Sequence, residues 1–221
     1  MKLLVEALVK FTCGLLLVGL LIFLPAGTVC YAYGWLLVGL LFGPMLIAGF
    51  VMMAKSPEFL KKRLDGKEKQ GTQKGVVALS GLMFIVGFVV AGLDFRFGWS
   101  YVPDQVVIAA SVLFLIAYAL YAEVMRENAY LSRTIKVEEG QTVVDTGLYG
   151  IVRHPMYAVT VLLFLMIPLV LGSWYALIVF AFYPVIIIVR LTDEEELLTK
   201  ELPGYCEYKQ KVKYRIIPFI W

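Results

Sequence analysis

Charged side chains are scarce in this chain. Asp, Glu, Lys and Arg make up 17% of its 221 residues, whereas 61% are hydrophobic. A soluble domain is roughly 45–50% apolar and about 25% charged. The composition therefore excludes an ordinary soluble domain and predicts a polytopic membrane protein. The apolar run at the N-terminus has no convincing small-residue cleavage site, so we expect it to be a retained span.

Several familiar site signatures are also missing. Cys13, Cys30 and Cys206 are far apart and form no CxxC pair, which argues against a disulfide framework or a zinc site. The sequence has no GxGxxG after a strand, no GxxxxGKS or GxxxxGKT, no HExxH and no GxSxG. Soluble nucleotide-binding folds and the common hydrolase and metalloprotease sites therefore have no support. Ionisable residues are rare inside the apolar runs, which argues against an ion-coupled transporter.

Long apolar blocks predict most of the fold. Helices of about 17–25 apolar residues span a bilayer. Four blocks of this kind lie at residues 3–24, 35–54, 76–93 and 106–125. We expect one membrane domain over residues 1–221, in which residues 1–125 are a four-span scaffold and residues 126–221 hold the polar chemistry.

A further run of 34 residues without a formal charge, 156–189, is too long for one span. As a straight helix it would measure about 50 Å, against a hydrocarbon core of about 30 Å. Pro168 and the sequence Gly172-Ser173-Trp174 interrupt it near its middle. The run is therefore predicted to form two helices of about 16 residues with a tight turn at Gly172-Ser173. The predicted fold is all-α, with about six transmembrane helices that include this C-terminal hairpin.

The chain is predicted to leave the membrane after the hairpin. Residues 191–200 extend the last helix into the cytosol, and Leu202-Pro203-Gly204 end it. Residues 205–213 then predict a short helix on the membrane surface, with Tyr205, Tyr208 and Val212 on its apolar face.

Basic residues predict the orientation. With six crossings, 19 of the 20 Lys and Arg residues lie on one side of the membrane and Arg96 alone on the other. Seven of them belong to a polar loop from Lys55 to Lys74, which we interpret as a topology signal and a contact for anionic lipids. The positive-inside rule places both termini and the polar stretch after residue 125 in the cytoplasm. We expect no nucleic-acid partner.

The hairpin is expected to bring two polar segments together. His154, the only histidine, precedes Pro155 and so lies at the lip of a helix. Arg190 and Glu194 share a helical face because they are four residues apart. Taken alone, these features are an interfacial histidine and a surface salt bridge worth about 0–1 kcal/mol. The consecutive acidic residues 193–196, which repel one another near a helix end, favour a site that serves a cation.

Short motifs in the last part of the chain occur in a defined order. They are GLY at 147–149, VRHPMY at 152–157, Arg190 with Glu194-Glu195, LPGYCEY at 202–208 and Ile217-Pro218. In this order and spacing, residues 128–221 resemble the isoprenylcysteine carboxyl methyltransferase and phospholipid methyltransferase superfamily of integral-membrane enzymes. The first three spans show only hydropathy and are interpreted as scaffold.

The resemblance implies S-adenosylmethionine as cofactor, in a pocket between the hairpin and the C-terminal segment. It implies that Arg190 faces the substrate and that the Arg190, Glu194 and Glu195 set carries catalysis. Glu195 would accept a proton if the acceptor is an amine. The residues implied to bind the cofactor are Gln141, Thr142, Val143, Val144, Tyr149, His154, Pro155, Met156, Tyr157 and Glu194. No metal ligand is implied.

The predicted function is therefore methyl transfer from S-adenosylmethionine to a lipophilic acceptor that enters from the bilayer. The acceptor is a carboxylate of isoprenylcysteine type or, alternatively, a phospholipid amine. An NADPH-dependent membrane reductase of sterol type stays open, because such enzymes share an Arg-His-Pro-x-Tyr pattern. A non-enzymatic scaffold or small transporter is a weaker alternative, since it has no need for the matching polar residues.

Overall fold

A computed structural model of the chain describes residues 2–64, 71–131 and 137–221, and within these residues the regular elements are all helical. The long helices are α1 (Lys2–Ala26), α2 (Ala32–Lys55), α4 (Gly71–Phe97), α5 (Asp104–Glu127), α6 (Pro155–Val170) and α8 (Tyr183–Glu201). The short elements are α3 (Pro57–Leu64), the 3-10 turn η1 (Gly147–Gly150), α7 (Trp174–Phe180) and α9 (Tyr205–Lys211). The predicted all-α architecture is confirmed.

Among the described residues, five helical segments are long and apolar enough to cross a membrane. They are Lys2–Ala26, Ala32–Lys55, Gln73–Phe97, Asp104–Glu127 and the combined arm Trp174–Glu201. The predicted sixth crossing is α6, whose 16 residues make a helix of about 24 Å. It is apolar but shorter than the other five.

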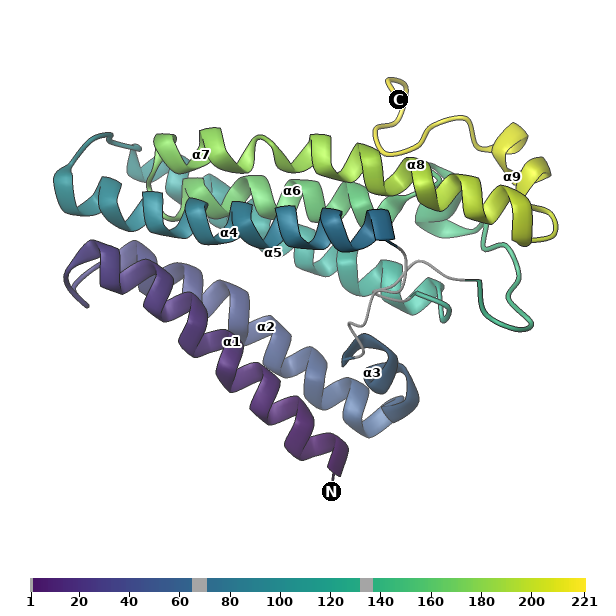
Figure 1. The fold of residues 1–221 in the computed structure, drawn as a ribbon, viewed down its shortest axis with the longest axis horizontal. Helices are drawn as coiled ribbons and strands as arrows, with labels where there is room; N and C mark the ends of the chain where they lie inside the picture. Colours follow the sequence, from purple (N-terminus) through teal and green to yellow (C-terminus); the bar gives the residue numbers. More distant parts are fainter. Residues whose placement is uncertain (1, 65–70, 132–136) are drawn as a thin grey trace.

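Helices α4 to α8 run side by side as a bundle, and α1 and α2 form a pair that leaves the bundle obliquely (Figure 1). α1 packs on α4, and α5 packs along α6. The α1–α2 turn, the α4–α5 loop and the α6–α7 turn gather at one end of the molecule, here called the tip end. α3, α9 and both chain termini lie toward the other end, here called the pocket end.

The hairpin turns where the sequence predicts it. α6 ends at Val170, Gly172 adopts φ +72°, and the Ser173 hydroxyl accepts a hydrogen bond from the Ala176 N–H to begin α7. The second arm differs from the prediction because it is interrupted at residues 181–182. Pro184 has no N–H to continue α7, so a new helix, α8, begins with this proline in its first turn.

Buried hydrogen bonds hold the hairpin at the tip end. The Asp94 carboxylate, 1% exposed, accepts hydrogen bonds from the Ser173 hydroxyl at 2.5 Å and from the Ser100 N–H and hydroxyl at 2.7 and 2.6 Å. The Tyr31 hydroxyl donates to the Leu171 carbonyl. These contacts tie the turn to α2 and α4. Because helices are stiff, they also set where the other ends of both arms lie.

The polar loop from Lys55 to Lys74, at the pocket end, differs from expectation. The polar loop contains a short helix, α3, from which Lys62 forms a 2.5 Å ion pair with Glu138 and Arg63 donates to the Tyr121 hydroxyl. Four of the basic residues used to predict the orientation lie outside the described residues: Lys67, Lys69, Arg133 and Lys136.

The apolar face of α9, which the sequence pattern assigns to contact with the membrane surface, contacts protein instead. Its apolar face, with Tyr205, Tyr208 and Val212, is buried. That face packs with Leu202 against Val137, Val143 and Leu198. Residues 205–211 do form an amphipathic helix, but α8 and the loop before η1 cover its apolar side. The helix is therefore packed into the protein through this side.

Candidate active site

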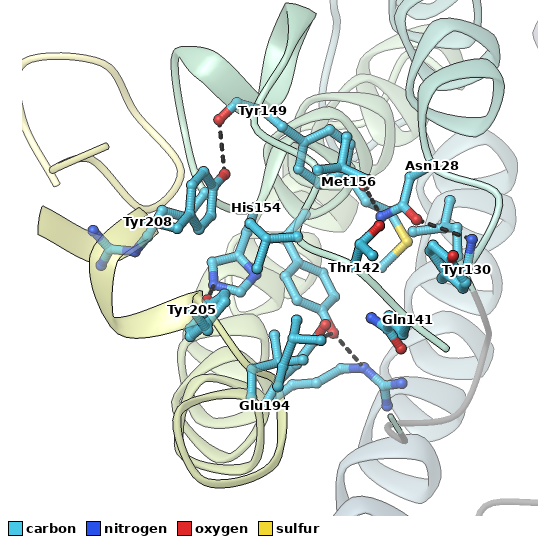
Figure 2. A pocket seen from close by; sticks show the side chains of 18 residues that line it. Asn128, Tyr130, Gln141, Thr142, Tyr149, His154, Met156, Glu194, Tyr205 and Tyr208 are labelled. Atoms are coloured by element: carbon cyan, nitrogen blue, oxygen red, sulfur yellow. Dashed lines mark hydrogen bonds between the residues drawn. The ribbon is translucent and has the colours of Figure 1, made fainter. Parts of the chain in front are cut away.

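A pocket opens at the pocket end, between the start of α6, α8 from Arg190 onward, α9 and the segment between α5 and η1 (Figure 2). Its cavity volume is about 90 Å³, which is smaller than the roughly 300–1,000 Å³ usual for small-molecule sites. Figure 2 shows Tyr205 and Tyr208 of α9 on one side and Asn128, Tyr130 and Gln141 on the other.

The pocket unites most of the predicted site residues. Ten of the twelve line it: Gln141, Thr142, Val143, Val144, Tyr149, His154, Met156, Tyr157, Arg190 and Glu194. Pro155 and Glu195 are not in the lining. Pro155 begins α6 and is buried, and the buried Glu195 contacts Arg153 and His154 of the lining.

Eight further residues complete the lining and were given no role from the sequence. They are Asn128, Tyr130, Leu131, Arg153, Leu198, Leu202, Tyr205 and Tyr208. Arg153, Leu202, Tyr205 and Tyr208 belong to the motifs on which the resemblance rests, so their order along the chain was the available signal. Asn128, Tyr130 and Leu131 follow α5 without any pattern that marks them.

His154 occupies the N-terminal boundary of α6, where Pro155 takes the first helical position. The backbone N–H groups of Arg153 and His154 donate to the carbonyls of Tyr214 and Arg215, both at 2.9 Å, so the C-terminal segment is paired with this stretch. The imidazole is 5% exposed. An interfacial histidine solvated by lipid headgroups is therefore excluded.

Glu195 lies in a buried cluster of cationic and ring groups. Its Oε1 is 2.6 Å from Arg153 Nε and 3.2 Å from His154 Nε2, and its Oε2 is 3.0 Å from Arg215 Nε. Arg153 also donates to two carbonyls of the C-terminal segment. The acidic stretch was expected to serve a cation, and for Glu195 the cations belong to the chain itself. The Glu195 carboxylate is thus engaged by groups of the chain itself and is not part of the pocket lining.

Glu194 points into the pocket although it is next to Glu195 in sequence (Figure 2). Consecutive residues on an α-helix are separated by about 100°, so two adjacent side chains serve different surfaces. The Glu194 carboxylate accepts a hydrogen bond from the Tyr157 hydroxyl. The Tyr157 oxygen in turn accepts a hydrogen bond of 3.0 Å from Arg190 Nε. Tyr157 therefore bridges Arg190 and Glu194 across the hairpin.

A glycine shapes the entrance to η1. Gly147 adopts φ +51°, and a Cβ at this position would lie 1.6 Å from Oε1 of Glu127. The other oxygen of Glu127 accepts a hydrogen bond of 3.1 Å from the Leu148 N–H. Because only glycine fits, Glu127 can hold this turn and thereby place Tyr149 in the pocket wall.

Three tyrosines form a connected wall. Asn128 donates to the Tyr149 hydroxyl at 3.0 Å, and the Tyr208 hydroxyl donates to the Tyr149 carbonyl at 2.7 Å. The Tyr205 hydroxyl lies 3.4 Å from His154 Nε2. Burial raises the pKa of Tyr149, Tyr205 and Tyr208 above its ordinary value. Their hydroxyls are therefore neutral hydrogen-bonding groups at physiological pH.

The arrangement suits a ligand with one cationic end and a larger apolar or aromatic body. Glu194 supplies an anionic group at the wall, and Asn128 and Gln141 supply amide donors and acceptors. Apolar side chains supply about half of the lining surface, and they are Leu131, Val143, Val144, Met156, Leu198 and Leu202.

Comparison with known protein families gives a match in this region of the chain. Residues 106–200 match the model of the isoprenylcysteine carboxyl methyltransferase family. The matched segment contains most of α5, all of η1, α6 and α7, and most of α8, and thus most of the pocket lining. No curated protein matches the chain. The segment 106–200 is therefore similar to the isoprenylcysteine carboxyl methyltransferase family, which agrees with the resemblance that the sequence motifs indicate.

Proposed function

We propose that the chain is a membrane methyltransferase that moves a methyl group from S-adenosylmethionine to a carboxylate on a lipophilic, prenylcysteine-like acceptor. The observation that carries the proposal is the pocket itself. It is built mainly from the segment that matches the family, and it has an acidic residue and an arginine, Glu194 and Arg190, in one lining.

The pocket residues fit the cofactor. When bound, S-adenosylmethionine supplies a methyl group activated by a sulfonium, together with an ammonium and a carboxylate. Glu194 would pair with the ammonium, because a charge-assisted hydrogen bond is stronger than a neutral one. Tyr149 and Tyr157 would offer aromatic faces to cationic groups, and Gln141 to Val144 would contribute a further part of the lining.

Tyr157 has a further role in this proposal. Its hydroxyl donates a hydrogen bond to the Glu194 carboxylate and accepts one from Arg190 Nε. It therefore keeps an anion and a cation at separate positions, where each can bind a group of opposite charge. Glu194 would serve the cofactor, and Arg190 would bind the acceptor carboxylate with its planar guanidinium.

A carboxylate acceptor also needs no catalytic base from the protein. With a pKa of about 4, it is already deprotonated at neutral pH, so its methylation releases no proton. Positioning of the acceptor about 3 Å from the methyl and exclusion of water then supply most of the rate. An amine acceptor would need a base, and Glu195, the residue considered for that task, is held among Arg153, His154 and Arg215.

The pocket end is proposed to face the cytosol. Arg96 is located in the last turn of α4, toward the tip end, whereas the basic residues of α3, α8 and α9 lie toward the pocket end. This distribution supports the orientation that the positive-inside rule predicts. A lipophilic acceptor would then enter from the bilayer and the cofactor from the cytosol.

Two measurements on the detergent-purified chain test the proposal. Calorimetry with S-adenosylhomocysteine and with NADPH should give binding of the first only; binding of NADPH alone would support the reductase alternative and reject this one. Transfer of labelled methyl should then be measured with an S-prenylated N-acetylcysteine and with phosphatidylethanolamine. Product from the lipid amine alone would replace the carboxylate acceptor with an amine.

A further inference from the structure

Gln73, in the first turn of α4, reaches the site from outside the segment that matches the family. Its side chain has no exposed surface. Burying an amide is costly unless its polar atoms are hydrogen-bonded. Both ends of the Gln73 amide have partners on α8: Oε1 accepts from Arg190 Nη1 at 3.2 Å, and Nε2 donates to Asp193 Oδ2 at 2.8 Å.

The two partners allow only one orientation of the amide. A guanidinium can only donate hydrogen bonds, and an ionised carboxylate can only accept them. The oxygen of Gln73 must therefore face Arg190 and its nitrogen must face Asp193. Glutamine is suited to this position because it offers an acceptor to the cation and a donor to the anion.

Gln73 and Tyr157 together define the plane of the Arg190 guanidinium. Tyr157 accepts from Nε, and Gln73 accepts from Nη1. Because the guanidinium is planar and rigid, two of its nitrogens bound to fixed partners determine the direction of the whole group. One partner comes from the hairpin and the other from α4, so the group is held between two helices that are far apart in sequence.

We propose that Gln73 is a positioning residue for the acceptor, which holds the Arg190 guanidinium in the plane from which it binds the acceptor carboxylate. This inference rests on the proposed function, in which Arg190 contacts the acceptor. It also gives α4 a part in the site, beyond that of scaffold. The role of Gln73 is separate from cofactor binding, since neither of its hydrogen bonds involves Glu194 or Tyr157.

The test compares two substitutions in the full-length chain. Gln73→Met keeps the length and shape of the side chain but removes both hydrogen bonds. Gln73→Glu keeps an oxygen for Arg190 and brings a second carboxylate to Asp193. Ser80→Ala, also in α4, removes a hydroxyl that bonds only within its own helix and serves as the matched control. Each variant is measured for S-adenosylhomocysteine affinity, for the acceptor KM and kcat, and for thermal unfolding.

The expected result is an acceptor KM about ten- to a hundredfold higher in Gln73→Met, as for loss of a hydrogen bond to a charged group. Its S-adenosylhomocysteine affinity should stay within about twofold of the unsubstituted chain, and Gln73→Glu should recover part of the KM. If Gln73 merely ties α4 to Asp193, Gln73→Glu will be the worse variant, because it places two carboxylates together. That order, or an unchanged KM in Gln73→Met, would overturn the positioning role.

Failure of the proposed function has a different signature. An unsubstituted chain that binds S-adenosylhomocysteine but methylates neither the prenylcysteine nor the lipid amine would reject the proposed function and, with it, the role of Gln73. An unsubstituted chain that turns over, with a Gln73→Met variant of equal acceptor KM, would reject only the role of Gln73.

Discussion

Arg153 and Glu195, 42 residues apart in the sequence, form a buried ion pair with 2.6 Å between Nε and Oε1. The pair joins the residue before His154 to the middle of α8, and Arg215 adds the C-terminal segment to it. It therefore joins three parts of the chain at the edge of the pocket, which Arg153 itself lines. Because Glu195 is locked there, Glu194 is held with its carboxylate toward the pocket.

Glu195→Ala is expected to destabilise the fold. Removal of one partner from a buried ion pair costs about 3–5 kcal/mol, because the remaining charges stay buried without compensation. Thermal unfolding of the purified variant should show a clearly lower midpoint. Glu196→Ala is the matched control, since Glu196 pairs with Lys200 at the surface and its loss should leave the midpoint unchanged. Equal midpoints for the two variants would contradict the buried cluster.

Substitution of Glu194 and of Arg190 should separate cofactor binding from turnover. Glu194→Ala removes the carboxylate that faces the pocket, and its S-adenosylhomocysteine affinity should fall by at least about tenfold, as for loss of a charge-assisted contact. Arg190→Ala should bind S-adenosylhomocysteine nearly as well as the unsubstituted chain but lose methyl transfer. Calorimetry and a labelled-methyl assay measure the two effects. A similar loss of affinity in both variants would refute the division of roles.

Gly147→Ala should disturb the pocket through the backbone. The positive φ of this residue costs a side-chain-bearing residue about 1–3 kcal/mol, and the new Cβ would overlap Glu127. We expect lower stability and weaker S-adenosylhomocysteine binding, because η1 carries Tyr149. Gly81→Ala, where a Cβ has no neighbour within 4 Å, is the control and should behave like the unsubstituted chain. Undiminished binding by Gly147→Ala would show that η1 tolerates another shape.

The native cysteines offer a test of orientation. Cys30 is exposed in the turn between α1 and α2 at the tip end, and Cys206 is exposed on α9 at the pocket end. In single-cysteine variants, a membrane-impermeant maleimide should label Cys30 on intact cells and Cys206 only after the membrane is opened. The reverse pattern would place the pocket on the outer side of the membrane. A cysteine placed at Ser173 in the hairpin turn would be a poor labelling site, because this position is buried against Asp94.

Local signals explain what was predictable about the fold. Breakers such as Gly172 and Pro155 act through their own backbone geometry, so the hairpin turn and the start of α6 are found at the expected residues. The sequence also marks the interruption before α8, because Pro184 lies in the first turn of the new helix. The helix within the basic loop was missed because its eight residues have no long apolar pattern.

The pocket was predictable in outline because its residues come in ordered motifs. Tyr149, His154, Tyr157, Arg190 and Glu194 all line it. The burial of the apolar face of α9 against protein was not predictable, because an amphipathic helix has the same pattern whether lipid or protein covers its apolar face. Asn128 and Gln73 were missed for a related reason: a single amide in a loop or a helix end carries no periodicity.

The sequence by itself determined that the chain spans a membrane, that the run after His154 turns back at Gly172, and that the polar residues meet at one end. These properties follow from hydropathy, length and residues with special backbones, all of which act locally. Only the tertiary structure decided which acid faces the pocket and which is buried with Arg153. The four acids are consecutive, and the rotation of α8 about its axis, set by packing against α4 and α6, assigns each one to a different surface.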